Sequence, residues 1–431
     1  MSIKNLTQKS FSVLIIRSFG VLLLFGFTLF ITNFYSAEDV GRYDFVRSTI
    51  MVLGGLALMG TNQSIIYFSG LLKARNSVES IRIIYFKMLR IIFALSLIIL
   101  LLFIVFFKLF SINEIFTGSE SIYLVRNTIL TVFFFSLTML NIDTIRALNK
   151  TIFSEMYRSI FRYLPIFLFA IILLFTNYQS LLVEAYLFGF VLLSCLSSIK
   201  VFRLLTKLGK LTNNSEKFTV KQIFKTSYPM ALSAIAYFIM QSIDVIILSM
   251  YKGFEEIAYY SVSVKLAMLT TLALMSVNIV IAPRIAEIYE NKEMQTLQKL
   301  IKRSTRIIFL ISVCVLAILF LFSEEILSLF GKDYSKANNA LLYLLSAQFF
   351  NAVSGPGAIY LNMTGRQRTL NKILIFGLAI NISLNFYLIP IEESYGGING
   401  AATATLVSLI IWNMIIVIQI YFKDKIKIFL T

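Results

Sequence analysis

The chain has 431 residues, of which 58% are hydrophobic and 14% are charged, and its mean hydropathy is +0.82. These values exclude an ordinary soluble protein and leave no length for a sizeable soluble domain. The formal net charge is +17, and histidine is absent, which removes the commonest metal ligand and the usual proton switch near neutral pH. We therefore expect a polytopic membrane protein without a cofactor or a bound metal.

Apolar runs of about 18 residues or more follow one another along the whole chain, and each is long enough to cross a bilayer as a helix. They lie near residues 11–32, 44–69, 88–110, 122–145, 155–176, 180–202, 226–250, 258–283, 306–323, 337–363, 370–390 and 397–422. The predicted fold class is an all-α polytopic membrane protein with about twelve transmembrane helices.

Charged residues alternate in sign from one turn to the next. Lys and Arg collect at every second turn, whereas the turns between them carry acids such as Glu38, Asp39, Glu255 and Glu256. Because cytoplasmic loops retain positive charge during insertion, this pattern predicts a cell-membrane protein with both termini in the cytoplasm. Insertion and contact with anionic lipids explain the charge. Nucleic-acid binding is not expected, since it would need a basic soluble domain.

Two short motifs occur once in each half of the chain. Residues 38–43 correspond to residues 255–260, and residues 148–151 correspond to residues 361–364, at the nearly equal offsets of 217 and 213. A constant offset indicates a duplicated unit.

Since each half holds an even number of spans, the two repeats are expected to be parallel, with a cavity between their lobes. We predict an N-terminal six-helix lobe over 1–210, a basic cytoplasmic linker over 211–225 and a C-terminal six-helix lobe over 226–431.

An ordered set of short motifs runs from about residue 225 to the C-terminus. It comprises Ser242-Ile243-Asp244, Ala258-Tyr259-Tyr260, Lys265-Leu266, Ala282-Pro283-Arg284, residues 329–334, residues 361–366, residues 385–390 and residues 395–402. In its order and spacing this set resembles the Wzx-type oligosaccharide flippases of the multidrug/oligosaccharidyl-lipid/polysaccharide exporter superfamily. The match in the first half is looser.

The resemblance implies an alternating-access transporter rather than an enzyme. Its cargo would be a polyprenyl-diphosphate-linked oligosaccharide, moved from the cytoplasmic to the outer leaflet for O-antigen, capsule or another envelope polymer. Membrane lipids and other proteins of polysaccharide assembly are the further partners that it implies.

Apart from the cations that belong to the basic clusters at span ends, three cations lie inside predicted spans. A charge there costs about 2.5 to 3.5 kcal/mol on insertion scales and is a functional candidate by default. The three cations are Arg47, Arg126 and Lys265. Alignment of the two repeats places Arg47 and Lys265 at nearly the same depth, so they are candidates to flank a cationic cavity that binds a diphosphate or an acidic sugar. Snorkelling to the outer interface, or pairing of Arg47 with Asp44 or Asp39, is the alternative.

Two carboxylates inside spans are candidates for an ion-coupling site or for counter-ions. Asp244 either pairs with Lys265 or binds the H⁺ or Na⁺ that drives transport, and Asp143 has Arg146 three residues away on the same helix face. No phosphate-binding GxxxxGK[ST] loop is present, which leaves an ion or substrate gradient as the driving force.

Pro165 and residues 354–357 are candidate helix breaks in the fifth and tenth spans, although membrane helices often carry Pro and Gly without one. A small-residue face over residues 396–404 predicts close helix packing. Two other functions stay open. One is a cation-coupled drug or metabolite antiporter of the same superfamily, and the other is a membrane glycosyltransferase or polymerase that acts on the same lipid carrier. The slight excess of intramembrane cations favours an anionic substrate.

Overall fold

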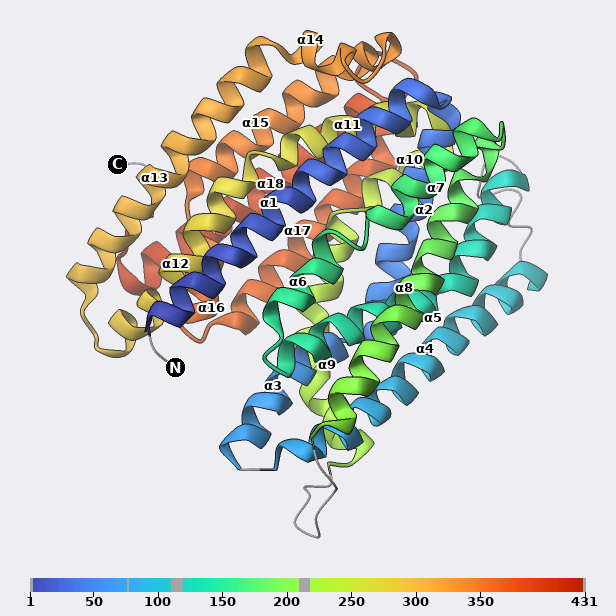
Figure 1. Cartoon of the computed structure of the whole chain (residues 1–431). Coiled ribbons are helices and arrows are strands. Elements are labelled where there is room, and N and C mark those ends of the chain that lie inside the picture. Colours follow the sequence, from blue (N-terminus) through green and yellow to red (C-terminus); the bar gives the residue numbers. More distant parts are fainter. Residues whose placement is uncertain (1–2, 76, 110–118, 209–217, 429–431) are drawn as a thin grey trace. The chain divides into compact units, whose positions relative to one another are not determined.

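The computed structural model describes residues 3–75, 77–109, 119–208 and 218–428, and every regular element in these ranges is helical (Figure 1). Apolar sequence in a bilayer has no water to satisfy its backbone, so internally hydrogen-bonded helices are the structure that such runs adopt. The chain divides into two compact units, Met1–Ser242 (unit 1) and Ile243–Thr431 (unit 2).

Unit 1 is built around one central helix, α5, which contacts α2, α3, α4, α6 and α8. Its α-helices are α1 (Ile3–Phe34), α2 (Ala37–Leu58), α3 (Thr61–Ala74), α4 (Ile81–Leu109), α5 (Ser119–Ala147), α6 (Thr151–Ser159), α7 (Leu164–Phe175), α8 (Leu182–Thr206) and α9 (Val220–Met240). Short 3₁₀ turns, Val78–Ser80 and Gln179–Leu181, precede α4 and α8.

Unit 2 is arranged around α18, which contacts α10, α11, α15, α16 and α17. Its α-helices, coloured from yellow-green to red in Figure 1, are α10 (Ile243–Tyr251), α11 (Phe254–Met268), α12 (Thr271–Glu290), α13 (Met294–Leu321), α14 (Ser323–Ser328), α15 (Asn338–Ser354), α16 (Gly357–Met363), α17 (Gln367–Leu388) and α18 (Gly397–Asp424). The 3₁₀ turn Lys332–Ala337 lies between α14 and α15.

The polytopic all-α class is confirmed. Among the described residues, nine helical stretches are long and apolar enough to cross a membrane, and the pair α2 and α3, bent by 42°, passes as a further span. The other two expected spans, the seventh and the tenth, are helical but interrupted, the seventh between α9 and α10 and the tenth between α15 and α16. The count of twelve is therefore compatible with the structure.

Both candidate helix breaks occur. The fifth expected span is interrupted by turns at residues 160–163, directly before Pro165 in the first turn of α7. The tenth is interrupted at Gly355, whose φ of +63° suits glycine, and a Cβ there would lie 2.3 Å from Oγ1 of Thr305. The turns at both breaks keep backbone hydrogen bonds, from the N–H of Tyr163 to the carbonyl of Ile160 and from the N–H of Gly355 to the carbonyl of Ala352.

The predicted small-residue face of α18 packs as expected. Gly400, Ala401, Ala402 and Ala404 are buried, and a Cβ at Gly400 would lie 2.9 Å from the backbone of Leu388. Helices α17 and α18 therefore approach each other closely, which holds the polar side chains of both helices within hydrogen-bonding distance.

Helix α9 packs against α2, α3 and α4 of unit 1. At this contact Ser64 and Ser227 share a hydrogen bond of 2.6 Å, and Gly60, at a φ of +74°, leaves room for the carbonyl of Ser227. Most of the expected linker, residues 211–217, lies outside the described residues. The lobe boundary at 211–225 stays a prediction.

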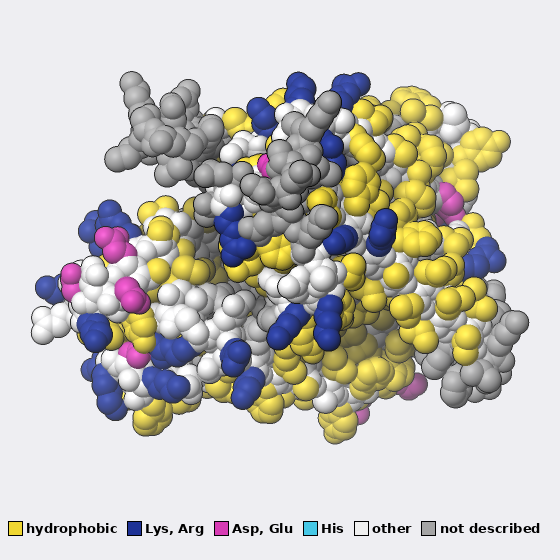
Figure 2. All heavy atoms as spheres, turned by 90° about the horizontal axis from the view of Figure 1, so that it is seen from below, with side chains coloured by type: hydrophobic (Ala, Val, Ile, Leu, Met, Phe, Trp, Pro, Cys, Tyr) yellow, Lys and Arg dark blue, Asp and Glu magenta, His cyan; other side chains and the backbone are white. Residues whose placement is uncertain are grey.

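Figure 2 shows one face of the molecule, on which Lys and Arg side chains (dark blue) outnumber Asp and Glu side chains (magenta). Hydrophobic side chains (yellow) surround these charges. An uneven charge distribution of this kind agrees with the sidedness that the loop charges predict.

Candidate functional site

Unit 1 contains an ion pair inside the membrane-spanning helix α2. Nε of Arg47 lies 2.9 Å from Oδ1 of Asp44, one turn away. The Asp44 side chain is fully buried, whereas the Arg47 side chain is 21% exposed. The pairing of Arg47 that the sequence offered as an alternative is thus present, and part of the Arg47 side chain remains exposed.

A second guanidinium, that of Arg162, belongs to the same cluster. Arg162 lies in the break between α6 and α7, and its guanidinium carbon is 5.8 Å from the ring centroid of Tyr163. It interacts electrostatically with Arg47 and with three tyrosines, Tyr43, Tyr163 and Tyr186. The Tyr43 and Tyr186 rings are buried and meet edge to face at 4.9 Å. We call Asp44, Arg47, Arg162 and these three tyrosines the arginine cluster.

The arginine cluster has an excess of positive charge. Within the part of the chain that the structure describes, Asp44 is the carboxylate that pairs with Arg47, and no ion pair to Arg162 is formed. Two guanidinium groups in one partly buried site repel each other, and an added anion would relieve that repulsion. Planar guanidinium forks suit the oxygens of a phosphate, so the cluster is chemically suited to bind one.

The other two predicted cations lie elsewhere. Arg126 is exposed on α5 and stacks on Tyr123 of the same helix, with 5.3 Å between the guanidinium carbon and the ring centroid. Lys265 is buried in α11 of unit 2, with 4% of its surface exposed. Neither residue belongs to the arginine cluster as the contacts define it.

Asp143 is a counter-ion in unit 1. Its Oδ1 lies 2.5 Å from Nη2 of Arg158 on α6, and Nδ2 of Asn62 donates to its Oδ2 at 3.3 Å. The expected partner, Arg146, has its side chain exposed instead. Arg158 reaches Asp143 because the short loop after α5 turns α6 back along α5. The spacing of residues on one helix face does not predict this contact.

Asp244, at the start of α10, is buried among neutral hydrogen-bond donors from three other helices. The hydroxyls of Tyr260 and Thr405 donate to Oδ2 at 2.8 and 2.5 Å, and Nδ2 of Asn385 donates to Oδ1 at 2.7 Å. No cation pairs with it among the described residues. The burial of Asp244 is thus satisfied by dipoles rather than by an opposite charge.

Further oxygens surround Asp244. Asn385 also donates to the backbone carbonyl and side-chain oxygen of Asn381, at 2.9 and 3.1 Å, while its own Oδ1 is buried without a hydrogen-bond partner. A buried acceptor without a donor costs about 1 to 3 kcal/mol. Asp244, Asn381, Asn385 and Thr405 thus share one buried hydrogen-bond network, which we call the Asp244 cage. Its side-chain oxygens are of the kind that small hard cations bind.

Several of these residues were not predicted from the sequence. Arg162 was grouped with the cytoplasmic loop charges, although the nearby Pro165 marked a break that could bring it into the membrane-spanning part. Asn381 and Asn385 are spaced four apart in an apolar run, which places both on one helix face. That spacing was the available signal for the cage.

The fold is that of a class of membrane transporters. An inward-facing multidrug resistance MATE family transporter of the MOP superfamily aligns over 94% of both chains with a TM-score of 0.75 at 14% identity. The lipid II flippase MurJ, in an inward closed conformation, covers 96% of this chain and 88% of its own with a TM-score of 0.72 at 17% identity. These likenesses establish the shared fold.

The chain belongs to the polysaccharide biosynthesis protein family, whose model matches residues 6–289; the MatE model matches residues 229–387. A capsular polysaccharide biosynthesis protein, CapF, of Staphylococcus aureus is 28% identical over 199 residues. That alignment covers 45% of this chain and 48% of CapF, so the chain spans about half the length of this relative. The resemblance to the exporter superfamily is confirmed.

Proposed function

We propose that this protein is a flippase that translocates a polyprenyl-diphosphate-linked oligosaccharide from the cytoplasmic to the outer leaflet of the cell membrane by alternating access. The observation that carries the proposal is the excess positive charge of the arginine cluster in a chain of the polysaccharide biosynthesis family. Transport without covalent chemistry agrees with the transporter fold, and both termini lie in the cytoplasm in the orientation that we propose.

In this proposal the arginine cluster binds the diphosphate. An anion with several oxygens accepts hydrogen bonds from Arg162 and from Arg47, and it competes with Asp44 for Arg47. Asp44 would then neutralise Arg47 when no substrate is bound and would help to release the substrate. Arg126 in unit 1 and Lys265 in unit 2 stay candidate substrate contacts, each within its own unit.

Coupling to an ion gradient is assigned to the Asp244 cage. A Na⁺ ion would take the carboxylate, the amide oxygens of Asn381 and Asn385 and the Thr405 hydroxyl as ligands, and a proton would bind the carboxylate itself. The unpartnered Oδ1 of Asn385 supports a cation ligand at this position. Asp143, paired with Arg158, serves as a structural counter-ion.

A second candidate function is an antiporter for cationic drugs or metabolites. The match of the MatE model to residues 229–387 and the likeness to a multidrug transporter favour it. The two candidates predict opposite substrate charge at the arginine cluster, because its uncompensated guanidinium repels a cation and attracts a phosphate.

The test is a flipping assay in proteoliposomes that contain a polyprenyl-diphosphate-linked oligosaccharide. Leaflet-selective labelling of the sugar should show transbilayer movement with the native protein and little movement with Arg162→Gln. Arg203→Gln, which removes an exposed cation at the end of α8, is the matched control and should stay active. Movement of a cationic dye without movement of the lipid-linked sugar would establish the antiporter instead.

The same liposomes test the coupling ion. Sodium should raise the thermal stability of the native protein by about 2.7 kcal/mol at a hundred times its dissociation constant, and Asp244→Asn should abolish this increase. If the native protein is unaffected by Na⁺, a flipping rate that responds to an imposed pH gradient would assign the proton instead. In the host, depletion of the protein followed by mass spectrometry of the lipid that accumulates would identify the sugar.

A further inference from the structure

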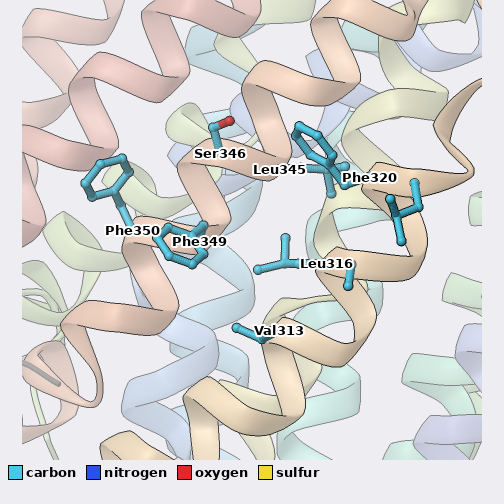
Figure 3. A pocket seen from close by; sticks show the side chains of 9 residues that line it. Val313, Leu316, Phe320, Leu345, Ser346, Phe349 and Phe350 are labelled. Atoms are coloured by element: carbon cyan, nitrogen blue, oxygen red, sulfur yellow. The ribbon is translucent and has the colours of Figure 1, made fainter.

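Unit 2 carries an apolar groove between α13 and α15, outside the arginine cluster and the Asp244 cage. It has a volume of about 480 Å³, and Figure 3 shows side chains from both helices pointing into it. Its walls include Val313, Ala317 and Phe320 of α13, and Ser346, Phe349 and Phe350 of α15.

The chemistry of these walls suits a hydrocarbon. The lining contains a single polar side chain, Ser346, whose hydroxyl donates to the carbonyl of Leu342 at 2.8 Å and so is already satisfied. Three phenylalanines, Phe320, Phe349 and Phe350, are each more than one third exposed. The polar groups of a bound molecule would find no hydrogen-bond partner on these walls. This excludes a lipid headgroup or a sugar from the groove.

Exposed cations precede the groove along α13, about two helical turns before its first lining residue. Arg303 and Arg306 are exposed on α13, and no charged residue follows until the end of that helix. Val313, Ala317 and Phe320 follow Arg306 at spacings of seven, eleven and fourteen residues, which places all four on one helix face. A lipid phosphate at Arg306 would therefore have its chain aligned with the groove.

The length of the groove distinguishes between kinds of lipid chain. At about 1.5 Å per residue, Val313 lies about 10 Å and Phe320 about 21 Å from Arg306 along α13. A single leaflet contributes about 15 Å of hydrocarbon, half of a core of about 30 Å. A phospholipid held at Arg306 would fill only the near part of the groove, whereas a chain longer than one leaflet would fill all of it.

We propose that this groove holds the isoprenoid chain of a polyprenyl diphosphate whose phosphates lie at Arg306, as a recruitment site in the cytoplasmic leaflet. The inference rests on the proposed function for its choice of lipid and goes beyond it by naming a second site, separate from the arginine cluster. The orientation is the one that the loop charges predict, with the start of α13 in the cytoplasm.

The test is photo-crosslinking in nanodiscs with a polyprenyl diphosphate that carries a diazirine near the end of its chain. The label is expected on α13 around Phe320 and on α15. Ala317→Trp, which fills the groove, should reduce labelling about tenfold. Ile318→Trp is the matched control, since Ile318 is the next residue, is 57% exposed and does not line the groove; its labelling should be unchanged.

Two further arms sharpen the result. Ser346→Phe fills the groove from α15 and should act like Ala317→Trp, with thermal unfolding used to verify that each variant is folded. Arg306→Gln should reduce labelling about fivefold, because one cation near an anionic headgroup contributes about 1 kcal/mol. A polyprenyl probe shorter than one leaflet should label residues near Val313 but not Phe320.

Three outcomes would overturn the assignment. Equal labelling of Ala317→Trp and Ile318→Trp would place the chain elsewhere, and equal labelling by a phosphatidylglycerol probe would assign the groove to ordinary lipid. Crosslinks between two copies of the chain through α13 and α15 would make it a dimer interface. The flipping assay is independent: groove labelling without flipping contradicts only the proposed function, and flipping without groove labelling contradicts only the recruitment site.

Discussion

The polar centres of the two units differ in how they stabilise buried charge. In unit 1, Asp44 is neutralised by Arg47, and Arg162 beside them leaves an excess of positive charge. In unit 2, the carboxyl oxygens of Asp244 accept hydrogen bonds from three neutral donors, and no cation pairs with them among the described residues. The first arrangement is suited to attract an anion and the second to attract a cation.

The comparison shows that one fold can offset the free-energy cost of a buried charge in two different ways. An ion pair removes net charge and needs two side chains to meet, whereas a cage of dipoles keeps the charge and needs several short polar side chains around it. In our proposal the first solution serves the diphosphate and the second serves the coupling ion.

The largest effect is expected from Asp244→Ala. This change leaves the hydroxyls of Tyr260 and Thr405 and the amide of Asn385 without their acceptor, so the free energy of unfolding should fall by about 3 to 5 kcal/mol. Thermal or denaturant unfolding in nanodiscs measures it. Asp333→Ala, which breaks an exposed pair with Lys336, is the control and should cost less than about 1 kcal/mol. Equal losses would refute the cage.

Next in size is the loss of phosphate binding in Arg162→Gln. Hydrogen bonds to charged groups contribute about 1.5 to 3 kcal/mol, so the dissociation constant for a polyprenyl diphosphate should rise about 10- to 100-fold. The dissociation constant of Arg162→Lys should lie between those of Arg162→Gln and the native protein, because an ammonium group keeps the charge but loses the planar fork of donors. Equilibrium binding in nanodiscs decides this, and unchanged affinity in Arg162→Gln would remove Arg162 from the site.

Asp44→Asn should act in the opposite direction. Without the competing carboxylate, Arg47 is free to bind the substrate, so affinity for the diphosphate should increase about tenfold while release and flipping become slower. Comparing the binding constant with the flipping rate separates these effects. Weaker binding would instead mean that Asp44 holds Arg47 in its binding geometry.

The smallest predicted effect compares two tyrosines. Tyr260→Phe removes one donor to Asp244 and should lower the free energy of unfolding by about 1 kcal/mol. Tyr186→Phe keeps the ring that packs against Tyr43 and should cost less. Unfolding measurements on both variants would show whether a tyrosine hydroxyl contributes more to stability in the Asp244 cage than in the arginine cluster.

Much of the fold could be predicted from apolar periodicity, because a bilayer forces long apolar runs into helices. The breaks at Pro165 and at Gly355 were also predictable, since proline removes a donor and a positive φ favours glycine. The grouping of α9 with unit 1 was not, because it depends on contacts such as that of Ser64 with Ser227 rather than on any local pattern.

The candidate site was predictable only in part. Arg47 and Asp244 stood out because charges inside apolar runs are costly, but their partners could not be derived from spacing. Asp143 shows the limit: Arg146 has the correct helical spacing, yet Arg158 forms the pair because α6 returns along α5. Thr405 lies 161 residues from Asp244 in the chain, and only the packing of α10 against α18 brings the two together.

The sequence by itself determined that the chain is a polytopic helical membrane protein with a few costly charges inside its spans, because hydropathy and charge act locally along the chain. The tertiary structure decided which of those groups pair with an opposite charge and which are surrounded by neutral hydrogen-bond donors. These outcomes depend on side chains from different helices coming within hydrogen-bonding distance, and such distances are set by packing rather than by spacing in the sequence.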